Sequence, residues 1–355
     1  MRLPKVASEP VLPSTPYNYD NPDDPTNNLA TLGRVLFYDK ALSSSNNVSC
    51  ASCHKQSLSF SDDQRLSPGV NNLQTTRNTL PIQNLTPITF VGADSSSNSG
   101  YGAAEGGAMN VTIGGLFWDG REGDLRRMVI MPLENPNEMG SGLSITKLLK
   151  LPYYKLLFQN AFGYEYIEPD QVASALTAFV LSLKTPNTRF DQYRIAVNNG
   201  QTGNNILSEQ EIKGMQLFEG KYNCNNCHQV ENASRSVPRF ANIGLAPYAD
   251  QGLANITGNV ADEGKFRVPS LRNVEFTAPY MHDGSLLTLE SVIKHYSDGI
   301  VDHPNLHPDL LDENNHARKM NISAEDTQAL IAFLLTLSDK SITNDPKFSD
   351  PFREN

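Results

Sequence analysis

Apolar side chains recur at helical spacing in several stretches of the chain. The clearest stretch runs from Asp170 to Leu183, where positions 172, 175, 176, 179, 180 and 183 form one apolar face. Similar spacing predicts helices over about 28–38, 145–158 with a break at Pro152, 288–296 and 323–337, and a short helix from about 124. Gly and Pro are frequent between these stretches, so we expect a mainly α fold with long loops and little β structure.

Two Cys-x-x-Cys-His sequences contain all four cysteines of the chain. On a helical turn, the thiols at i and i+3 share one face and the histidine at i+4 lies beside them. The thiols can then add to the two vinyl groups of a haem while the imidazole ligates its iron, which is the attachment pattern of c-type haem. The residues concerned are Cys50, Cys53, His54, Cys224, Cys227 and His228.

Two other sites also use Cys-x-x-Cys pairs, namely thioredoxin-like redox centres and zinc sites. Neither explains why a histidine follows both pairs directly. We therefore predict two covalently bound haem c groups. Because thioether attachment takes place outside the cytoplasm, we also expect a periplasmic protein. The chain opens Met-Arg-Leu-Pro without a signal peptide, so we expect that a leader has been removed.

Similar apolar sequences flank the two haem motifs. Gly33-x-x-Leu36-Phe37 precedes the first motif, and Gly214-x-x-Leu217-Phe218 precedes the second. The sequence 178–183 ends the first half of the chain, as 332–337 ends the second. These ordered pairs predict two cytochrome-c-like haem domains that are related by an internal repeat.

The same features predict the domain boundaries. A proline-rich, extended arm is expected at 1–26, and the N-terminal haem domain at 27–200. Within the latter, about 185–205 is expected to be a polar linker. The C-terminal haem domain is expected at 201–338, opening with a helix capped by Ser208 and Glu211, and a polar tail at 339–355.

Composition narrows the classes of partner. A chain of 355 residues can bury a sizeable core in one or two domains. Its net charge of −10 gives no electrostatic case for nucleic-acid binding and would suit a basic redox partner. No apolar run approaches the ~18 residues that a membrane span requires. The sequence leaves both a monomer and a homodimer open.

The ligand opposite the proximal histidine decides what a c-type haem does. No other histidine lies between His54 and His228, so we expect the first iron to keep an open position that peroxide can reach. Met109 and Met128 are the alternative ligands, although Met more often fills gaps in a core. Cleaving peroxide also needs a proton shuttle. Glu134 and Glu138 both qualify, and their spacing does not choose between them.

The second haem has more candidates for its sixth ligand. They are Met281, His282, His295 and Tyr296. On the expected helix 288–296, Tyr296 shares the apolar face while His295 points about 100° away. A phenolate ligand would stabilise oxidised iron, whereas the alternative for Tyr296 is a buried structural residue.

Taken together, these residues resemble the bacterial dihaem cytochrome c peroxidase and MauG family, from about Leu32 to Leu337. The matching segments are Cys50–His54, Arg77-Asn78, Phe117–Arg121, Asn135–Met139, Cys224–His228, Arg267–Asn273 and Thr277–Gly284. The resemblance implies that His54 holds the peroxide-reactive haem and His228 the electron-transfer haem. It also implies that Trp118 relays electrons between them and that Glu138 is the distal acid–base residue.

The family pattern further implies a calcium ion bound by Asn78, Thr277 and Pro279, two of them through backbone carbonyls, as suits a hard cation. Tyr296 stands where conventional members have Met and MauG-like members have Tyr. The loop after the first motif also lacks the histidine of conventional members. The chain is thus MauG-like in its predicted axial ligation, and we expect it to react with peroxide without prior reduction.

Two departures concern the reaction itself. Met128 replaces the Gln that the family usually has near the distal pocket, and Tyr222 replaces the surface Trp of MauG. We therefore expect a periplasmic dihaem peroxidase that reduces hydrogen peroxide at the first haem. Its electrons would come through the second haem from a small donor protein, such as a cytochrome c or a cupredoxin. The alternatives are MauG-like oxidation of residues in a partner protein and a non-enzymatic dihaem electron carrier.

Overall fold

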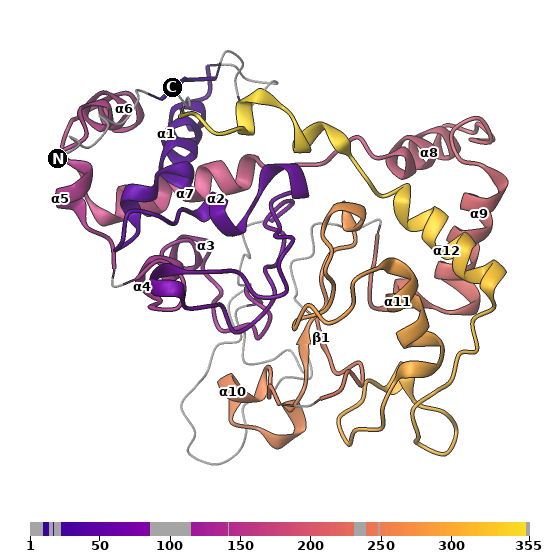
Figure 1. Ribbon diagram of the computed structural model, residues 1–355. Coiled ribbons are helices and arrows are strands. Elements are labelled where there is room, and N and C mark those ends of the chain that lie inside the picture. The colour runs from indigo at the N-terminus through magenta and orange to yellow at the C-terminus, as the bar shows by residue number, and fades with distance from the viewer. Residues whose placement is uncertain are drawn as a thin grey trace, which may run out of the picture.

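The computed structural model describes residues 10–13, 17, 23–85, 115–140, 142–230, 239–247 and 249–352. Over these residues the fold is mainly helical with little β structure, as predicted (Figure 1). The helices are α1 Thr26–Tyr38, α2 Cys50–Cys53, α3 Leu125–Met128, α4 Met131–Glu134, α5 Ile145–Leu148, α6 Pro152–Phe162, α7 Pro169–Ser182, α8 Arg189–Asn198, α9 Glu209–Gln216, α10 Ala254–Thr257, α11 Leu289–Lys294 and α12 Ala324–Leu335.

The first half is built around the crossing of α1 and α7. The apolar face predicted for α7 is buried, with Val172, Ala175 and Phe179 all fully inaccessible to solvent. Gly33 lies where α1 meets α7, and a β-carbon added there would stand 1.9 Å from the carbonyl oxygen of Ala175. The missing side chain is therefore what lets the two helices approach so closely.

The second half contains the same arrangement in α9 and α12. A β-carbon added at Gly214 would stand 1.9 Å from the carbonyl oxygen of Ala329, with Phe333 beside it. The apolar side chains of this half, which include Phe218, Phe333 and Leu337, form a core cluster of their own. Figure 1 shows the two helix pairs on opposite sides of the molecule.

Two segments differ from the sequence-based expectation. The polar linker expected at about 185–205 contains α8, which is held by a capping box between Thr188 and Asp191. The sequence pattern did not predict α8, because only Phe190 and Ala196 of this helix are buried and its apolar pattern is weak. The helix expected at 145–158 is divided into α5 and α6 by a break at Leu149–Leu151, and Pro152 opens the second piece, where a missing N–H costs nothing.

The last residues of the chain return to the first half. The polar tail expected at 339–355 forms two short helical turns, and its Ile342 and Phe348 are buried in the core cluster of α1 and α7. The ring of Phe348 packs near that of Phe179, with 6.4 Å between the two ring centroids. In Figure 1 the chain runs back from α12 to end next to α1.

The strands are short. β1 Phe240–Ala241 pairs antiparallel with β2 Phe266–Arg267, and Phe240 lies opposite Arg267. This two-stranded ribbon lies in the second half and adjoins the first, because the backbone N–H of Arg267 donates to the carbonyl of Trp118 at 2.8 Å. Among the described residues, no helix has the length and apolar character needed to cross a bilayer.

Candidate haem sites

The first Cys-x-x-Cys-His sequence folds as the predicted helical turn. Ser49 caps it through a capping box with Ser52, and the turn α2 carries Cys50 and Cys53. His54 follows at the C-terminal end, and its Nδ1 lies 3.0 Å from the carbonyl oxygen of Phe60. A carbonyl can only accept, so Nδ1 carries the proton and Nε2 is left with its lone pair for a metal.

The second sequence repeats this arrangement. Residues Cys224–Asn226 form a single 3₁₀ turn, and the Nδ1 of His228 lies 3.1 Å from the carbonyl oxygen of Pro269. Burial lowers the pKa of His54 and so favours its neutral imidazole, although the Phe60 carbonyl and Asp62 oppose this shift. In both places the chain supplies an oriented imidazole beside two thiols.

The thiols lack the environment of a redox-active pair. Burial raises the pKa of Cys50 to about 12 and that of Cys53 to about 11. Burial likewise raises the pKa of Cys224 to about 12. Reactive cysteine pairs depend instead on electropositive surroundings that lower the thiol pKa. The buried thiols therefore fit covalent attachment of a haem better than thiol–disulfide exchange.

His54 faces a cavity of about 180 Å³ in the first half. Cys50, Cys53, Met128 and Glu138 line the same cavity. Among its described lining residues, His54 is the sole histidine and no tyrosine occurs. Met128 is thus the alternative sixth ligand that the structure places in this cavity, whereas Met109 lies outside the described residues.

Glu138 and Glu134 occupy very different environments. Glu134 is exposed at the end of α4, whereas Glu138 is half-buried and faces the cavity. Burial raises the pKa of Glu138, and this effect exceeds the opposing influence of Asn135 and Arg121. The Nδ2 of Asn135 donates to Oε1 of Glu138 at 2.7 Å, which fixes the carboxyl group and leaves Oε2 for proton transfer.

His228 faces a second cavity of about 290 Å³. Tyr296 lines this cavity, at the point where α11 continues into a π-helical turn over His295–Gly299. His295 does not line it, and its Nε2 lies 2.9 Å from the carbonyl oxygen of Ile243. Burial raises the pKa of Tyr296, so the free phenol stays protonated at neutral pH.

Met281 and His282 also line the second cavity. His282 is stacked on Phe266, with 3.6 Å between the ring centroids and 13° between the planes. Its ring is therefore held against an aromatic neighbour. The structure thus brings Tyr296, Met281 and His282 to the cavity of His228 and removes His295 from the set of candidates.

Trp118 lines both cavities. Its Nε1 donates to the carbonyl oxygen of Asn78 at 2.8 Å, and its own carbonyl accepts from the backbone N–H of Arg267 at 2.8 Å. The indole is thereby fixed to Asn78 of the first half, and the backbone of Trp118 is joined to the second half through Arg267.

Asn78, Thr277 and Pro279 all line the second cavity. The side-chain amide of Asn78 donates to the carbonyls of Gln64 and Arg65 at 3.1 and 3.3 Å, so its Oδ1 is turned away from them. An amide oxygen and backbone carbonyls are ligands that Ca²⁺ accepts, and the donor set fits the predicted ion.

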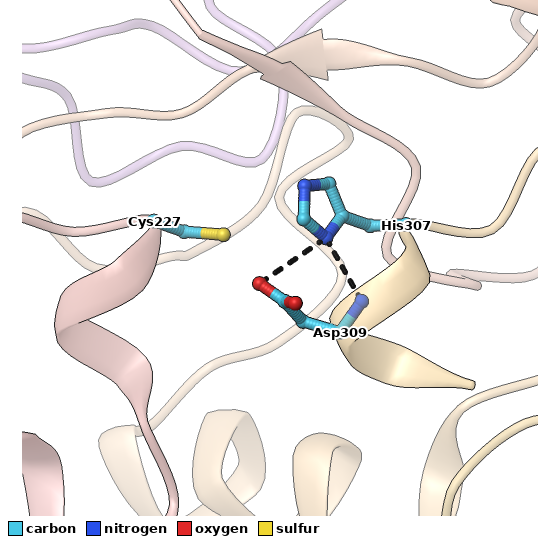
Figure 2. A group of neighbouring side chains, drawn as sticks. All are labelled: Cys227, His307 and Asp309. Carbon is cyan, nitrogen blue, oxygen red and sulfur yellow. Dashed lines mark hydrogen bonds and ion pairs between the residues drawn. The ribbon is translucent and has the colours of Figure 1, made fainter. Parts of the chain in front are cut away.

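One further cluster combines groups that often bind metals. The ligand atoms of Cys227, His307 and Asp309 lie within 4.8 Å of one another. Figure 2 shows the three side chains as neighbours. Cys227 belongs to the second haem-attachment motif, and a thioether to the haem uses its thiol. Only His307 and Asp309 remain, and Asp309 also accepts from Nδ2 of Asn226. The donor set therefore fits an edge of the haem cavity better than a separate metal site.

A fold with two such cavities, each with an oriented imidazole and a Cys-x-x-Cys pair, defines a dihaem c-type protein. The chain belongs to the di-haem cytochrome c peroxidase family, whose model matches residues 27–199. It is 32% identical over 296 residues to the cytochrome c551 peroxidase of Nitrosomonas europaea, covering 81% of this chain and 77% of that protein. It is 31% identical to the methylamine utilization protein MauG of Methylorubrum extorquens, covering 91% and 81%.

Solved structures agree with this assignment. A MauG-like protein associated with microbial copper homeostasis superposes with a TM-score of 0.69 at 31% identity, over 99% of both chains. The diheme peroxidase BthA from Burkholderia thailandensis superposes with a TM-score of 0.63 at 21% identity, over 99% of this chain and 97% of that one, and shows the shared fold. This protein is accordingly a peroxidase-type oxidoreductase with haem c cofactors.

Sequence reasoning assigned no role to two arginines near the cavities. Arg77 pairs with Asp119 at 2.5 Å and with Asp250 at 2.6 Å, and Arg267 lines both cavities. Both lie in segments that match the family, but neither position follows from helical periodicity or from a metal-binding motif. The partners of Arg77 become evident only once the two halves are packed together.

Proposed function

We propose that this protein reduces hydrogen peroxide in the first cavity with electrons that a small redox protein delivers to the second. The observation that carries the proposal is Glu138, a carboxyl group with a raised pKa that faces the same cavity as His54. The two cavities also differ as the proposal requires, since the second contains Tyr296 and the described lining of the first contains no tyrosine and no histidine besides His54.

When bound in the first cavity, the haem supplies the iron that takes up peroxide and the electrons that break its O–O bond. The ionised form of Glu138 accepts the proton of the incoming peroxide and returns it to the outer oxygen, which leaves as water. Asn135 keeps the carboxyl group oriented during this transfer. Over a full turnover, two electrons and two protons convert one peroxide into two waters.

Electrons reach the first cavity through Trp118 in this proposal. Trp118 lines both cavities, and one 2.8 Å hydrogen bond fixes its indole while a second fixes its backbone carbonyl, which supports a relay of constant geometry. Tyr296 would be the sixth ligand of the second iron in this proposal, because its half-buried side chain lines the same cavity as His228. A cytochrome c or a cupredoxin is the class of donor, and the periplasm is the compartment in which haem c is attached.

A calcium ion at Asn78, Thr277 and Pro279 completes the proposed site. These residues belong to the boundary at which Trp118 also lies, since the carbonyl of Asn78 accepts the indole N–H. The ion would therefore hold in place the same backbone that orients the indole.

We also propose that the two haem domains are related by an internal repeat, over 27–200 and 201–338. The support is the identical approach of Gly33 to Ala175 and of Gly214 to Ala329. The matched hydrogen bonds of His54 and His228 to backbone carbonyls support it as well.

The second candidate function is MauG-like oxidation of residues in a partner protein. Tyr296 and the histidine-free loop after the first motif favour it, because both are MauG-like features. Tyr222 counts against it. This side chain is 4% exposed and donates to Asp326 at 2.8 Å, so it does not offer the surface aromatic through which oxidising power would leave.

One experiment tests the proposal and its alternatives. Ferric protein is mixed with one equivalent of peroxide, and spectra are recorded before and after. A high-spin haem that reacts at once, followed by turnover with reduced cytochrome c, is the expected result. A ferric protein without any high-spin haem would instead indicate an electron carrier. Failure with every small donor, together with a stable two-electron-oxidised state, would indicate the MauG-like reaction.

A further inference from the structure

Arg267 is a half-buried cation that has no anionic partner among the residues that the structure describes. Burial lowers the pKa of its guanidinium, and no nearby carboxylate offsets this effect. Its side chain makes no ion pair and no hydrogen bond with any residue that the structure describes. Other arginines at the boundary between the halves are paired, since Arg77 contacts Asp119 and Asp250, and Arg272 contacts Asp191 at 2.6 Å.

An unpaired buried guanidinium is costly, because a charge removed from water needs a partner to compensate the lost hydration. Arg267 also faces open space, since it lines both the cavity of His54 and the cavity of His228. The anion that it lacks therefore belongs to whatever fills these cavities. Each haem carries two propionates, and a guanidinium pairs with a carboxylate through two parallel hydrogen bonds.

The backbone holds Arg267 firmly in this position. β2 pairs with β1 through Phe240 opposite Arg267, and the N–H of Arg267 donates to the carbonyl of Trp118 at 2.8 Å. The ring of the neighbouring Phe266 stacks on the ring of His282. The guanidinium carbon of Arg77 lies 5.5 Å from the centroid of the Phe266 ring. The side chain thus projects from a braced ribbon beside the indole that lines both cavities.

We propose that Arg267 binds haem propionate at the boundary between the two cavities and places one positive charge between the two haems. This inference depends on the presence of two haems and not on the peroxide reaction. A positive charge near an iron stabilises its reduced form, because reduction adds an electron. Arg267 therefore raises the reduction potentials of both haems and fixes the propionate edge next to Trp118.

The test compares Arg267→Met and Arg267→Lys with the unmodified holoprotein, in the absence of peroxide. The midpoint potential of each haem is measured by spectroelectrochemistry, and the propionate bending bands are recorded by resonance Raman spectroscopy. In Arg267→Met we expect both potentials to fall and a propionate band to shift. In Arg267→Lys we expect potentials close to the unmodified values with a shifted propionate band, because lysine keeps the charge but loses the bidentate contact.

Lys265→Met is the matched control. Lys265 lies two residues away on the same segment and carries the same charge, but it pairs with Asp262 at 3.0 Å and does not line either cavity. Its replacement should leave the propionate bands and both potentials unchanged. Potentials and bands that stay unmodified in Arg267→Met would overturn the proposal. If that variant does not assemble, Arg267→Lys decides alone, and an unshifted propionate band in it would overturn the proposal equally.

Discussion

At the scale of single residues, the environment of a side chain decides its chemistry more than its type does. Glu134 and Glu138 are four positions apart, yet one is exposed to solvent and the other faces the cavity of His54. Because burial raises the pKa of Glu138, its carboxyl group keeps a proton at higher pH than a solvated Glu does, which suits a group that must both accept and return one.

Replacing Glu138 with Gln removes the group that moves the peroxide proton. We expect the rate of the peroxide reaction to fall by about 10²–10⁴-fold, as is typical for loss of a general acid–base residue. Stopped-flow spectroscopy with peroxide measures this rate. Glu134→Gln is the matched control and should react normally. A Glu138→Gln protein with undiminished peroxide kinetics would exclude the proposed role.

The pH dependence of the same reaction follows from the sign of the pKa shift. Glu138 must be ionised to accept the proton of peroxide, and its pKa lies above the ordinary value for Glu. The rate should therefore decrease as the pH falls through this raised pKa, at a higher pH than a solvated Glu would give. The acid limb should be absent from the residual rate of Glu138→Gln. If the rate of that variant still fell at acid pH in the same way, the titrating group would not be Glu138.

Tyr296→Phe tests the ligand of the second iron. If the phenol is the sixth ligand, its removal changes the low-spin signal in electron paramagnetic resonance and leaves the high-spin signal of the first haem unaltered. Tyr280→Phe is a suitable control, because Tyr280 also lines the second cavity but donates to the carbonyl of Val274 at 3.0 Å. An unaltered low-spin signal in Tyr296→Phe would exclude Tyr296 as the ligand and leave Met281 and His282 as the candidates.

At the scale of elements, an apolar face predicted helices such as α7, and the capping box of Ser208 and Glu211 predicted α9. The stripe of Val172, Ala175 and Phe179 predicts α7 because burial of one face drives a helix onto a core. α8 has almost no such stripe and is held by its cap at Thr188, so the spacing of its apolar residues does not predict it. The haem motifs were predictable for a different reason, since their geometry is confined to one turn of the backbone.

The helix crossings at Gly33 and Gly214 allow a direct test of element packing. Gly33→Ala places a β-carbon against the carbonyl of Ala175 and forces α1 and α7 apart. We expect a loss of unfolding free energy of about 1–3 kcal/mol, the usual cost of overpacking a core. Thermal or chemical denaturation of the holoprotein measures it.

Gly220→Ala provides the control for that experiment. Gly220 is helical, and no atom lies within 4 Å of a β-carbon added there. Alanine at this position should leave the stability unchanged or raise it by about 0.4–1 kcal/mol. Equal stability of Gly33→Ala and the unmodified protein would show that the two helices can separate without cost.

At the scale of the whole molecule, polar contacts join residues that are far apart in sequence. Arg77 reaches Asp250 across the boundary between the halves, and Nδ2 of Asn273 donates to Ser59 at 2.7 Å. Side chains so far apart in sequence meet only because of the complete fold, so no local pattern could have predicted these pairs. The same reason explains why the position of Arg267 escaped sequence reasoning.

Arg77→Met tests how firmly the halves are joined. Burial raises the pKa of Asp250, but the hydrogen bonds from Arg77 outweigh this effect and the net pKa is lowered. Loss of Arg77 leaves Asp250 without that partner and Asp119 with Arg121 alone. We expect a destabilisation of about 3 kcal/mol, at the lower end for breaking a buried ion pair, and slower electron transfer between the haems.

Arg65→Met is the control for this variant, because the exposed side chain of Arg65 contacts Asp283 across the same boundary at 3.6 Å. Exposed pairs contribute about 0–1 kcal/mol, so its loss should change little. Equal behaviour of the two variants in denaturation and in flash-induced electron transfer would show that the Arg77 contacts do not hold the halves together.

The return of the chain end to the first half has a consequence for biogenesis. Ile342 and Phe348 fill the core beside α1, so this core stays incomplete until the segment around Phe348 has been synthesised. The core of the N-terminal half, which is synthesised first, is therefore completed last. A truncation before Phe348 would therefore disturb the core against which Cys50 of the first haem motif packs, although the two segments are far apart in the chain.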